Sequence, residues 1–411
     1  MGCCPLLVRE TEGLERSDHR NLYFEILLAF ISILMYIICV EIFVFAACRS
    51  PISLPGSRGK GGFDRMRRSG KALSPGGVLF WIALLFAFLL SACTPAPTPR
   101  ESAAPSGAAG PELPAETPLA LHGQLRVRDG KLTDAAGRPF QLRGLSTHGL
   151  CWYPQYINAG AMASVRAAGG NVLRLAMYTE PEGAYFAEPE RNTDLVIQAI
   201  ENARAMGLYV LVDWHILNDG NPNDNLDRAI TFFDRIASSY PGDPAVLYEV
   251  CNEPNGVNWS DVLQYGYAIV PVIRQYSPEA VIVLGTPDYS FDLSGPLEQP
   301  PPWENCLCAW HWYAGEHGSR RMLEKALEAG LPVMVSEWGV GKNAAGEPAL
   351  EQGREFAAWL NEKGVSWCAW SLCSKDEVYS VLRPDCKKLS GWTAEDLSSV
   401  GALVFAALEG E

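Results

Sequence analysis

Basic residues are scarce in this sequence of 411 residues. It contains 33 Lys and Arg against 47 Asp and Glu, which gives a formal net charge of −14. The first 93 residues hold 10 of the basic and 7 of the acidic side chains, so the remainder has 23 basic against 40 acidic residues and a charge near −17. A surface of this sign repels phosphate backbones and anionic membranes. The composition therefore argues against nucleic acid as a partner and favours a neutral substrate.

Long apolar runs are also few, and two of them lie near the N-terminus. Residues 21–48 are long enough to span a membrane but include two glutamates. The second run begins at Met66 with basic residues, continues through an apolar stretch of secretory length and ends in the sequence LSAC at Cys93. This pattern resembles a bacterial lipoprotein signal. We therefore predict a signal peptide over 66–93 and lipidation of Cys93; a plain membrane anchor that ends in a cysteine is the alternative.

The segments around this signal define the expected domain organisation. Because a complete signal starts at Met66, residues 1–65 are either an over-extended start or an extra membrane segment. Residues 94–119 almost lack large apolar side chains and are rich in Pro, Ala, Ser and Thr, which is typical of a tether. We expect residues 120–411 to form the folded domain, exported and held at the bacterial cell surface or membrane as a lipoprotein.

Short apolar runs alternate with longer amphipathic segments in this domain. An alternating stretch around Asp129-Gly130, within 123–144, indicates a small β-hairpin cap. Helical spacing is clear in TDLVIQAIENARAMG, where a glycine closes the segment. The expected strands are 141–147, 171–178, 209–215, 245–251, 281–286, 307–313, 332–337 and 366–372. Eight such units predict an α/β fold, a (β/α)8 TIM barrel with an N-terminal hairpin cap.

A Gly-rich phosphate-binding loop is absent after the first of these strands. Such a loop is the mark of the nucleotide-binding doubly wound sheet, which is the second candidate for an alternating chain. Its absence favours the barrel.

Polar and aromatic residues gather at the ends of nearly all the expected strands. Two of them are carboxylates: Glu253 follows the fourth strand in EVCNEP, and Glu337 ends the seventh in SEWG. These strands face each other across a barrel mouth, and the carboxyl ends of barrel strands build active sites. A facing pair of carboxyl groups is what glycoside hydrolysis requires. For either glutamate alone, a solvated rim charge paired with Arg or Lys is an equal alternative.

Six blocks of sequence together carry a family resemblance. They are STHGLCWYP, DWHIL, NEP, HWYAGEHG, SEWG and WSLCSKDE. In their order and spacing, over about 140–385, the chain resembles glycoside hydrolase family 5, and within it the bacterial endo-β-1,4-glucanase (cellulase) subfamily. The resemblance implies a (β/α)8 barrel, no metal, no cofactor and a retaining mechanism through a glycosyl-enzyme intermediate. It also implies that Glu253 is the proton donor and Glu337 the nucleophile.

Chemistry suggests roles for residues beside these two. Glu337 must be ionised while Glu253 starts protonated, so their pKa values must differ. Arg174 supplies a positive charge that lowers the pKa of the nucleophile, and Tyr313 matches the family tyrosine that donates a hydrogen bond to it. We expect Asn252 to hold the 2-hydroxyl of the cleaved sugar.

Three histidines match substrate-site positions of the family: His148, His215 and His311. Together with the two glutamates they could be interpreted as a metal cluster. Catalytic zinc ligands usually include a short HxH or HExxH spacing, and the sequence has neither. We therefore expect no metal; each histidine alone could also be a structural rim residue.

Aromatic and charged side chains complete the expected cleft. Exposed aromatic rings stack on pyranose faces, and four fit such positions: Trp152, Tyr153, Tyr178 and Trp370. The resemblance also assigns a polar clamp on sugar hydroxyls to Lys375, Asp376 and Glu377. Without the resemblance, this triplet would be an ordinary solvated charge run.

The chain departs from the family pattern at two places. Cys151 and Cys373 replace residues that relatives usually have, on neighbouring strand ends, and we hypothesise a disulfide between them because an exported domain meets an oxidising environment. Two free buried thiols are the alternative. The loop GVGKNAAGEP also differs from the usual family form. Asn343 and Ala344 are matched to substrate contacts only by their positions in this loop.

Three functions remain open. The first is an endo-β-1,4-glucanase on cellulose or a related β-glucan. The second keeps the chemistry but acts on mannan, xylan or mixed-linkage glucan, and the third is a non-catalytic glycan-binding protein. We expect a monomer whose partners are a β-glucan polysaccharide and, through the lipid anchor or the N-terminal segment, the membrane.

Overall fold

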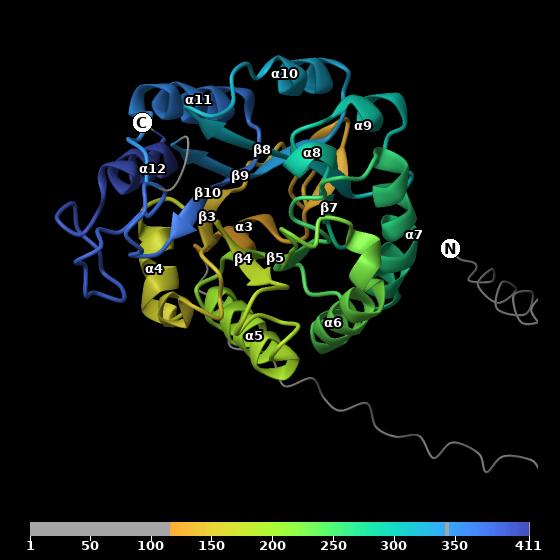
Figure 1. Cartoon of the computed structure of the whole chain (residues 1–411), viewed down its shortest axis with the longest axis horizontal. Coiled ribbons are helices and arrows are strands. Elements are labelled where there is room, and N and C mark those ends of the chain that lie inside the picture. The colour runs from red at the N-terminus through yellow and green to blue at the C-terminus, as the bar shows by residue number, and fades with distance from the viewer. Residues whose placement is uncertain (1–115, 342–344, 411) are drawn as a thin grey trace, which may run out of the picture. The chain divides into compact units, whose positions relative to one another are not determined.

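The computed structural model describes residues 116–341 and 345–410. Eight parallel strands close into a barrel, and helices surround it (Figure 1). The strands are β3 (Arg143–Thr147), β4 (Val172–Tyr178), β5 (Tyr209–His215), β6 (Val246–Glu249), β7 (Ile282–Leu284), β8 (Cys306–Ala314), β9 (Val333–Val340) and β10 (Trp367–Leu372), with β10 pairing back to β3. The predicted TIM barrel is confirmed.

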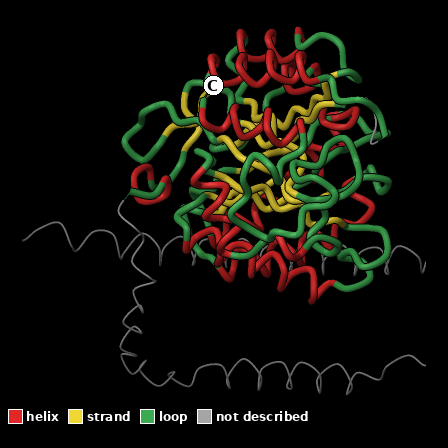
Figure 2. Tube along the Cα trace, turned by 90° about the vertical axis from the view of Figure 1, so that its left-hand side faces the viewer, coloured by secondary structure: helices red, strands yellow, loops and turns green. Residues whose placement is uncertain are grey.

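Helices form the outer layer and leave the strands in the interior (Figure 2). The longer ones are α4 (Ala159–Ala167), α5 (Pro189–Ala205), α6 (Leu226–Ser239), α7 (Trp259–Tyr276), α10 (Arg321–Glu328), α11 (Leu350–Lys363) and α12 (Ser399–Glu409). Shorter turns are α3 (Pro118–His122), α8 (Pro287–Ser290), α9 (Ser294–Glu298), η1 (Pro154–Tyr156) and η2 (Pro222–Asn225). Among the residues described, no helix is long and apolar enough to cross a membrane.

Local sequence explains where these helices lie. In α6, Ala229, Phe232, Phe233 and Ile236 recur three or four residues apart and are all buried, so one face packs on the barrel. After α5 the chain turns at Gly207, whose φ of +68° is a left-handed conformation that favours glycine. The capping residues thus fix the helix ends, and the apolar spacing fixes the packed face.

The predicted hairpin cap is confirmed. β1 (Arg126–Arg128) pairs antiparallel with β2 (Lys131–Thr133). Leu125 and Leu132 from this region join a buried cluster inside the barrel with Tyr209 and Leu211 of β5. The hydroxyl of Tyr209 also donates to the Gly123 carbonyl (2.7 Å). The cap therefore covers the amino-terminal ends of the strands and leaves the carboxyl ends free for a site.

Strand lengths differ from the expected ones at the carboxyl ends. β6 ends at Glu249 and β7 at Leu284, so the residues that follow leave the ladder earlier than predicted. β9 instead continues to Val340, because β8 also extends and pairs with it, with His311 opposite Glu337. Glu337 thus lies within a hydrogen-bonded strand rather than at its end, as a correction to the sequence-based boundary.

Candidate active site

Two cavities meet at the carboxyl ends of the strands. The first, of about 530 Å³, contains both Glu253 and Glu337. The second, of about 430 Å³, contains His148, Trp152 and Lys375. Both are lined by the same three aromatic residues: Tyr178, Trp370 and Tyr379. The shared lining makes one cleft with two halves, and the carboxyl pair lies in the first half.

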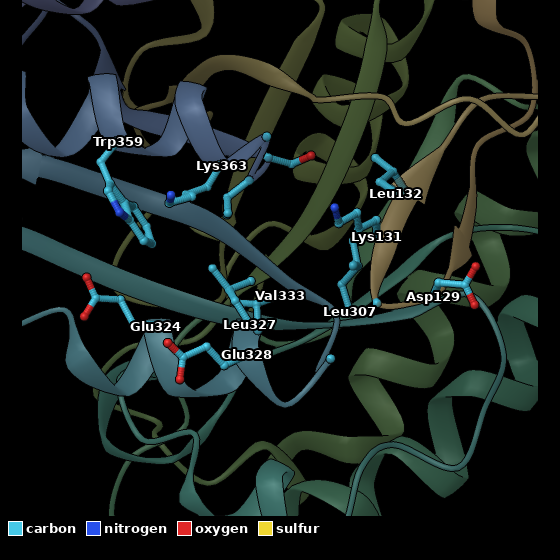
Figure 3. A pocket seen from close by; sticks show the side chains of 15 residues that line it. Asp129, Lys131, Leu132, Leu307, Glu324, Leu327, Glu328, Val333, Trp359 and Lys363 are labelled. Atoms are coloured by element: carbon cyan, nitrogen blue, oxygen red, sulfur yellow. The ribbon is translucent and has the colours of Figure 1, made fainter.

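Another cavity, of about 550 Å³, lies near the amino-terminal cap (Figure 3). Leu132 of β2, Leu307 of β8 and Val333 of β9 line it, with Glu324 and Glu328 of α10 on one side. This end of a TIM barrel ordinarily serves stability. Neither Glu253 nor Glu337 lines this cavity, so the candidate active site lies at the other end of the barrel.

The carboxyl groups of Glu253 and Glu337 approach each other closely. One oxygen of each, together with a nitrogen of His311, lies within 4.8 Å of the others. Glu337 is 5% exposed and comes from β9, whereas Glu253 comes from the segment after β6. The structure therefore brings together the two carboxylates that the sequence singled out.

Glu337 is surrounded by hydrogen-bond donors. Arg174 donates through Nη1 to Oε2 (2.9 Å), and the hydroxyl of Tyr313 donates to Oε1 (2.5 Å). Burial acts to raise the pKa of Glu337, but the charges of Arg174 and His311 and the Tyr313 hydrogen bond outweigh it and lower this pKa below its usual value. Glu337 is thus held as a carboxylate.

Glu253 has the opposite bias. Burial raises the pKa of its carboxyl group, and the negative charge of Glu337 raises it further, against a hydrogen bond from His311 Nδ1 to Oε1 (2.9 Å) that lowers it. The two pKa values are therefore displaced in opposite directions, as an acid and a nucleophile in one site require.

Arg174 organises the floor of this half of the cleft. It is fully buried and also contacts Asp213 Oδ2 (3.0 Å), Glu249 Oε2 (2.6 Å) and Asn252 Oδ1 (2.7 Å). Burial disfavours its charge, but the surrounding carboxylates prevail and raise its pKa well above the usual value. Arg174 therefore remains cationic inside the barrel.

Asp213, Glu249 and Ser336 belong to this network, and sequence reasoning missed them as site residues. Glu249 is buried, and Arg174 and His311 hold its pKa at about 2 although burial alone would raise it. Burial raises the pKa of Asp213. A charged residue inside an otherwise apolar run, as in LVDWH and VLYE, was the available signal.

His215 and Asn252 lie beside this network. His215 Nδ1 lies 2.6 Å from Asp213 Oδ2, and burial together with the Arg174 charge lowers the pKa of His215 to about 3, so the ring is neutral. Asn252 is fully buried; its amide donates to the Ile216 carbonyl (2.9 Å), and its oxygen accepts from Arg174. That Asn252 holds a sugar hydroxyl stays a prediction.

The second half of the cleft combines rings with charge. Lys375 Nζ lies 2.6 Å from Glu377 Oε2, and His148 Nε2 lies 3.5 Å from Glu377 Oε1. Burial acts to raise the pKa of Glu377, but His148 and Lys375 beside its carboxylate lower it below the usual value. Asp376 is exposed and is not among the residues that line either half. The structure thus groups two members of the predicted triplet.

The predicted aromatic residues form a contiguous wall. Trp152 and Tyr178 meet edge to face with centroids 4.8 Å apart, and Trp370 stacks near His215 at 5.4 Å. Tyr153 lies 4.9 Å from His148. Trp152 is 37% exposed and offers its ring to the cleft region. Flat apolar faces of this kind suit sugar rings.

Further residues line the first half and were not predicted: Asp288, Tyr289, Glu316, His317 and Tyr379. Asp288, Tyr289 and Ser290 have consecutive left-handed φ values of 57°, 59° and 56°. The Tyr289 amide donates to the Pro254 carbonyl (3.1 Å), and the Ser290 hydroxyl donates to the backbone carbonyl of Asn252 (2.6 Å). This turn therefore braces the backbone that carries Glu253, and Tyr289 is 51% exposed beside it.

The group of Glu253, His311 and Glu337 has dimensions that could suit a metal ion. Burial disfavours a charged His311, but the neighbouring carboxyl groups of Glu249 and Glu253 prevail and raise its pKa to about 9. Its Nδ1 faces Glu253, and its Nε2 lies 3.0 Å from Ser336 Oγ. A protonated imidazole has no lone pair for a metal. These three residues fit an acid-base site better than a metal site.

The hypothesised disulfide is wrong. Cys151 and Cys373 are both buried free thiols, and Cys373 Sγ instead lies 3.2 Å from Ser380 Oγ and 3.5 Å from Ser371 Oγ. Adjacent strands do not ensure that two sulfur atoms reach bonding geometry. The predictions for Cys93, Asn343 and Ala344 fall outside the described residues.

Comparisons with known proteins agree with this geometry. The model of the Cellulase (glycosyl hydrolase family 5) family matches residues 133–376. The chain belongs to glycosyl hydrolase family 5. It is 41% identical over 292 residues to Endoglucanase A of Butyrivibrio fibrisolvens, covering 68% of this chain and 67% of that protein. It is 39% identical over 294 residues to Endoglucanase N of Pectobacterium atrosepticum, covering 70% of this chain and 66% of that protein.

A solved family 5 structure gives the same result. The catalytic domain of Thermobifida fusca endoglucanase Cel5A, a variant in complex with cellotetraose, superposes with a TM-score of 0.68 at 33% identity over 71% of this chain and 99% of that one. The chain matches about two thirds of the length of the curated family members named above. Membership makes it a glycoside hydrolase and confirms the predicted family and fold.

Proposed function

We propose that this family 5 protein is a retaining endo-β-1,4-glucanase that cleaves internal bonds of cellulose or a related β-glucan by double displacement. The observation that carries the mechanism is the approach of one carboxyl oxygen of Glu253 and one of Glu337 to within 4.8 Å. Retaining enzymes hold the two groups about 5–5.5 Å apart, whereas inverting enzymes leave about 6.5–9.5 Å for a water molecule. The relatives' names, endoglucanases, support the endo mode and the glucan.

In the first step, the ionised Glu337 attacks the anomeric carbon. The bond from that carbon to the glycosidic oxygen breaks, and Glu253 gives its proton to the departing oxygen. Arg174 and the Tyr313 hydroxyl, which hold Glu337 at 2.9 and 2.5 Å, keep the nucleophile ionised and aimed. The product is a glycosyl ester on Glu337.

In the second step, the same residues act in reverse. Esterification removes the negative charge of Glu337, which is one cause of the raised pKa of Glu253, so Glu253 can remain ionised and act as a base. Water then attacks the anomeric carbon, its proton goes to Glu253, and the ester bond breaks. Glu337 leaves as a carboxylate, and the anomeric configuration is retained.

The two halves of the cleft take the two parts of the polymer. The wall of Trp152, Tyr178 and Trp370, with His148, Lys375 and Glu377, would hold sugars on the non-reducing side, where hydroxyls meet charged groups. The half with Tyr289 and Glu316 would hold the leaving sugars. A cleft open at both halves suits an internal position along a chain.

A reducing-end assay on soluble polysaccharides tests the substrate. We expect turnover of carboxymethylcellulose or mixed-linkage glucan, and activity on a mannan or xylan with none on cellulose derivatives would replace the proposal by its alternative. Glu253→Ala and Glu337→Ala should each abolish hydrolysis of polymer while binding persists, and NMR of the first product anomers should show retention. Binding by the wild type without any hydrolysis would instead support a glycan-binding protein.

We also propose export, with a lipid anchor on Cys93 that holds a monomeric enzyme at the membrane. The basic, apolar and small-residue order before Cys93 supports this. Mass spectrometry of the native N-terminus should find a diacylated Cys93, and an intact residue 2 would reject both the cleavage and the over-extended start. Sedimentation of the released domain should give the monomer mass.

A further inference from the structure

Glu249 is a buried carboxylate that the double displacement does not use. It is the last residue of β6 and is fully buried, and Glu253 follows it four positions later. Both of its oxygens are engaged: Oε2 accepts from Arg174 Nε (2.6 Å), and Oε1 accepts from the Ser336 hydroxyl (2.6 Å). A buried carboxylate with a cation on one oxygen and a hydroxyl on the other is fixed in orientation.

Each of these bonds continues to one carboxyl group of the active site. On one side, Arg174, which donates to Glu249 through Nε, also donates to Glu337 Oε2 through Nη1 (2.9 Å). On the other side, Ser336 Oγ lies 3.0 Å from His311 Nε2, and His311 Nδ1 lies 2.9 Å from Glu253 Oε1. Two arms thus leave Glu249, one of them to Glu337 and the other to Glu253.

Proton counting fixes the direction of the second arm. Ser336 has a single hydroxyl proton, and Glu249 takes it because an ionised carboxylate only accepts. The Ser336 oxygen can then only accept from His311 Nε2–H, so His311 Nδ1 and Glu253 Oε1 form the last hydrogen bond of the arm. The carboxylate of Glu249, 3.7 Å from His311 Nε2, favours the doubly protonated imidazole, in which Nδ1–H donates to Glu253.

We propose that Glu249 is a positioning residue that aligns both catalytic carboxyl groups at once, holding Glu337 through Arg174 and Glu253 through Ser336 and His311. This inference rests on the proposed function, because it assigns Glu253 and Glu337 their roles. Glu249 contacts neither the cleft nor the reacting atoms. Its effect is to fix the distance and protonation of groups that do.

The charges packed around Glu249 are consistent with this role. Arg174 faces it from β4, Asp213 from β5 and His311 from β8, and Glu337 of β9 shares Arg174 with it. The Cys368 thiol of β10 lies near it, and burial raises the pKa of that thiol, so it is neutral. Arg174 and His311 balance Glu249 and Glu337. Loss of the Glu249 charge would favour a neutral His311, which cannot donate from both nitrogens.

The test compares two variants on two substrates. Ser336→Ala cuts only the arm to Glu253, whereas Glu249→Gln removes the anchor of both arms. Hydrolysis of β-glucan needs the proton of Glu253, but formation of the glycosyl-enzyme from dinitrophenyl β-cellobioside does not, because its leaving group departs unprotonated. Glu328→Gln on α10, at the opposite end of the barrel, is the matched control.

We expect Ser336→Ala to lower kcat on β-glucan by about tenfold or more, the weight of one charge-assisted hydrogen bond, while its pre-steady-state burst rate with the cellobioside changes by less than about twofold. Azide, a nucleophile that needs no base, should restore the steady-state turnover of the cellobioside by Ser336→Ala. Glu249→Gln should lower both the polymer rate and the burst rate, with KM nearly unchanged. Glu328→Gln should behave as wild type.

An equal loss on both substrates for Ser336→Ala, or a normal burst rate for Glu249→Gln, would overturn the proposal. Ser336→Ala removes a single oxygen, so it decides the acid arm even if Glu249→Gln fails to fold. The activity of the wild type tests the proposed function separately. If it hydrolyses a polysaccharide other than β-glucan, the proposed substrate is wrong, but the comparison of Ser336→Ala with Glu249→Gln still tests the role of Glu249. A wild type that turns over neither substrate overturns both proposals.

Discussion

The hydrogen bond from Tyr313 to Glu337 allows a quantitative prediction for the variant Tyr313→Phe. The hydroxyl donates to Oε1 at 2.5 Å in a buried site, and hydrogen bonds to charged groups contribute about 1.5–3 kcal/mol. This bond stabilises only the ionised form of Glu337, so its loss raises the pKa of the nucleophile. At about 1.4 kcal/mol per pH unit, the acidic limb of the kcat/KM profile should move to higher pH by about one to two units.

The sign follows from the proposed role of Glu337 as the nucleophile. Because the nucleophile must be ionised, a higher pKa means that activity disappears at a higher pH on the acidic side. The assay is the pH profile of kcat/KM on a neutral cello-oligosaccharide, since a charged polymer would add its own titration. The control is Tyr276→Phe, which also removes a hydroxyl that donates to a carboxylate, Asp234, but on the surface of α7. An acidic limb that stays in place in Tyr313→Phe would refute the reasoning.

Three other changes have clear expected outcomes. Arg174→Met leaves buried carboxylates without their cation, so it should destabilise the domain by about 3–5 kcal/mol, measured by urea denaturation, and abolish turnover; a midpoint like that of wild type would contradict the network. Trp152→Ala should raise KM on cello-oligosaccharides by about tenfold with little change in kcat, whereas a loss confined to kcat would remove this ring from substrate binding. Because Cys151 and Cys373 are free thiols, a reductant should leave the melting temperature unchanged, and peptide mapping without reductant should find both alkylated.

The barrel and the carboxyl pair could be predicted because each leaves a local pattern. Apolar runs mark the strands, and Glu253 and Glu337 stand out where such runs meet polar residues. Glu249 and Asp213 leave a weaker pattern, because a charged residue in a strand can equally face solvent. Only closure of the barrel turns these side chains inward onto Arg174. Ser336 gives no signal at all until His311 and Glu249 are placed on either side of it.

Two features could not be read from spacing for geometrical reasons. The Cys151–Cys373 hypothesis used the adjacency of strands, but a disulfide depends on the directions of two side chains. The turn at Asp288–Ser290 holds three non-glycine residues in left-handed conformations, which local preferences disfavour. Tertiary hydrogen bonds to the backbone of Asn252 and Pro254 support this turn, and these are invisible in sequence.

Glu253 and Glu337, the proposed catalytic pair, differ in how the backbone holds them, and this difference matters for engineering. Glu337 lies inside β9 and is paired with β8, whereas Glu253 lies beyond the last ladder residue of β6 on a segment tied to the turn after β7. Exchange of the loop after β7 would therefore shift Glu253, the proposed proton donor, and change which leaving groups are tolerated. The carboxylate of Glu337, which forms the bond to the sugar in the proposed mechanism, would keep its place. Variants with a new aglycone range should be sought at that turn, and the strand pair β8 and β9 should be left intact.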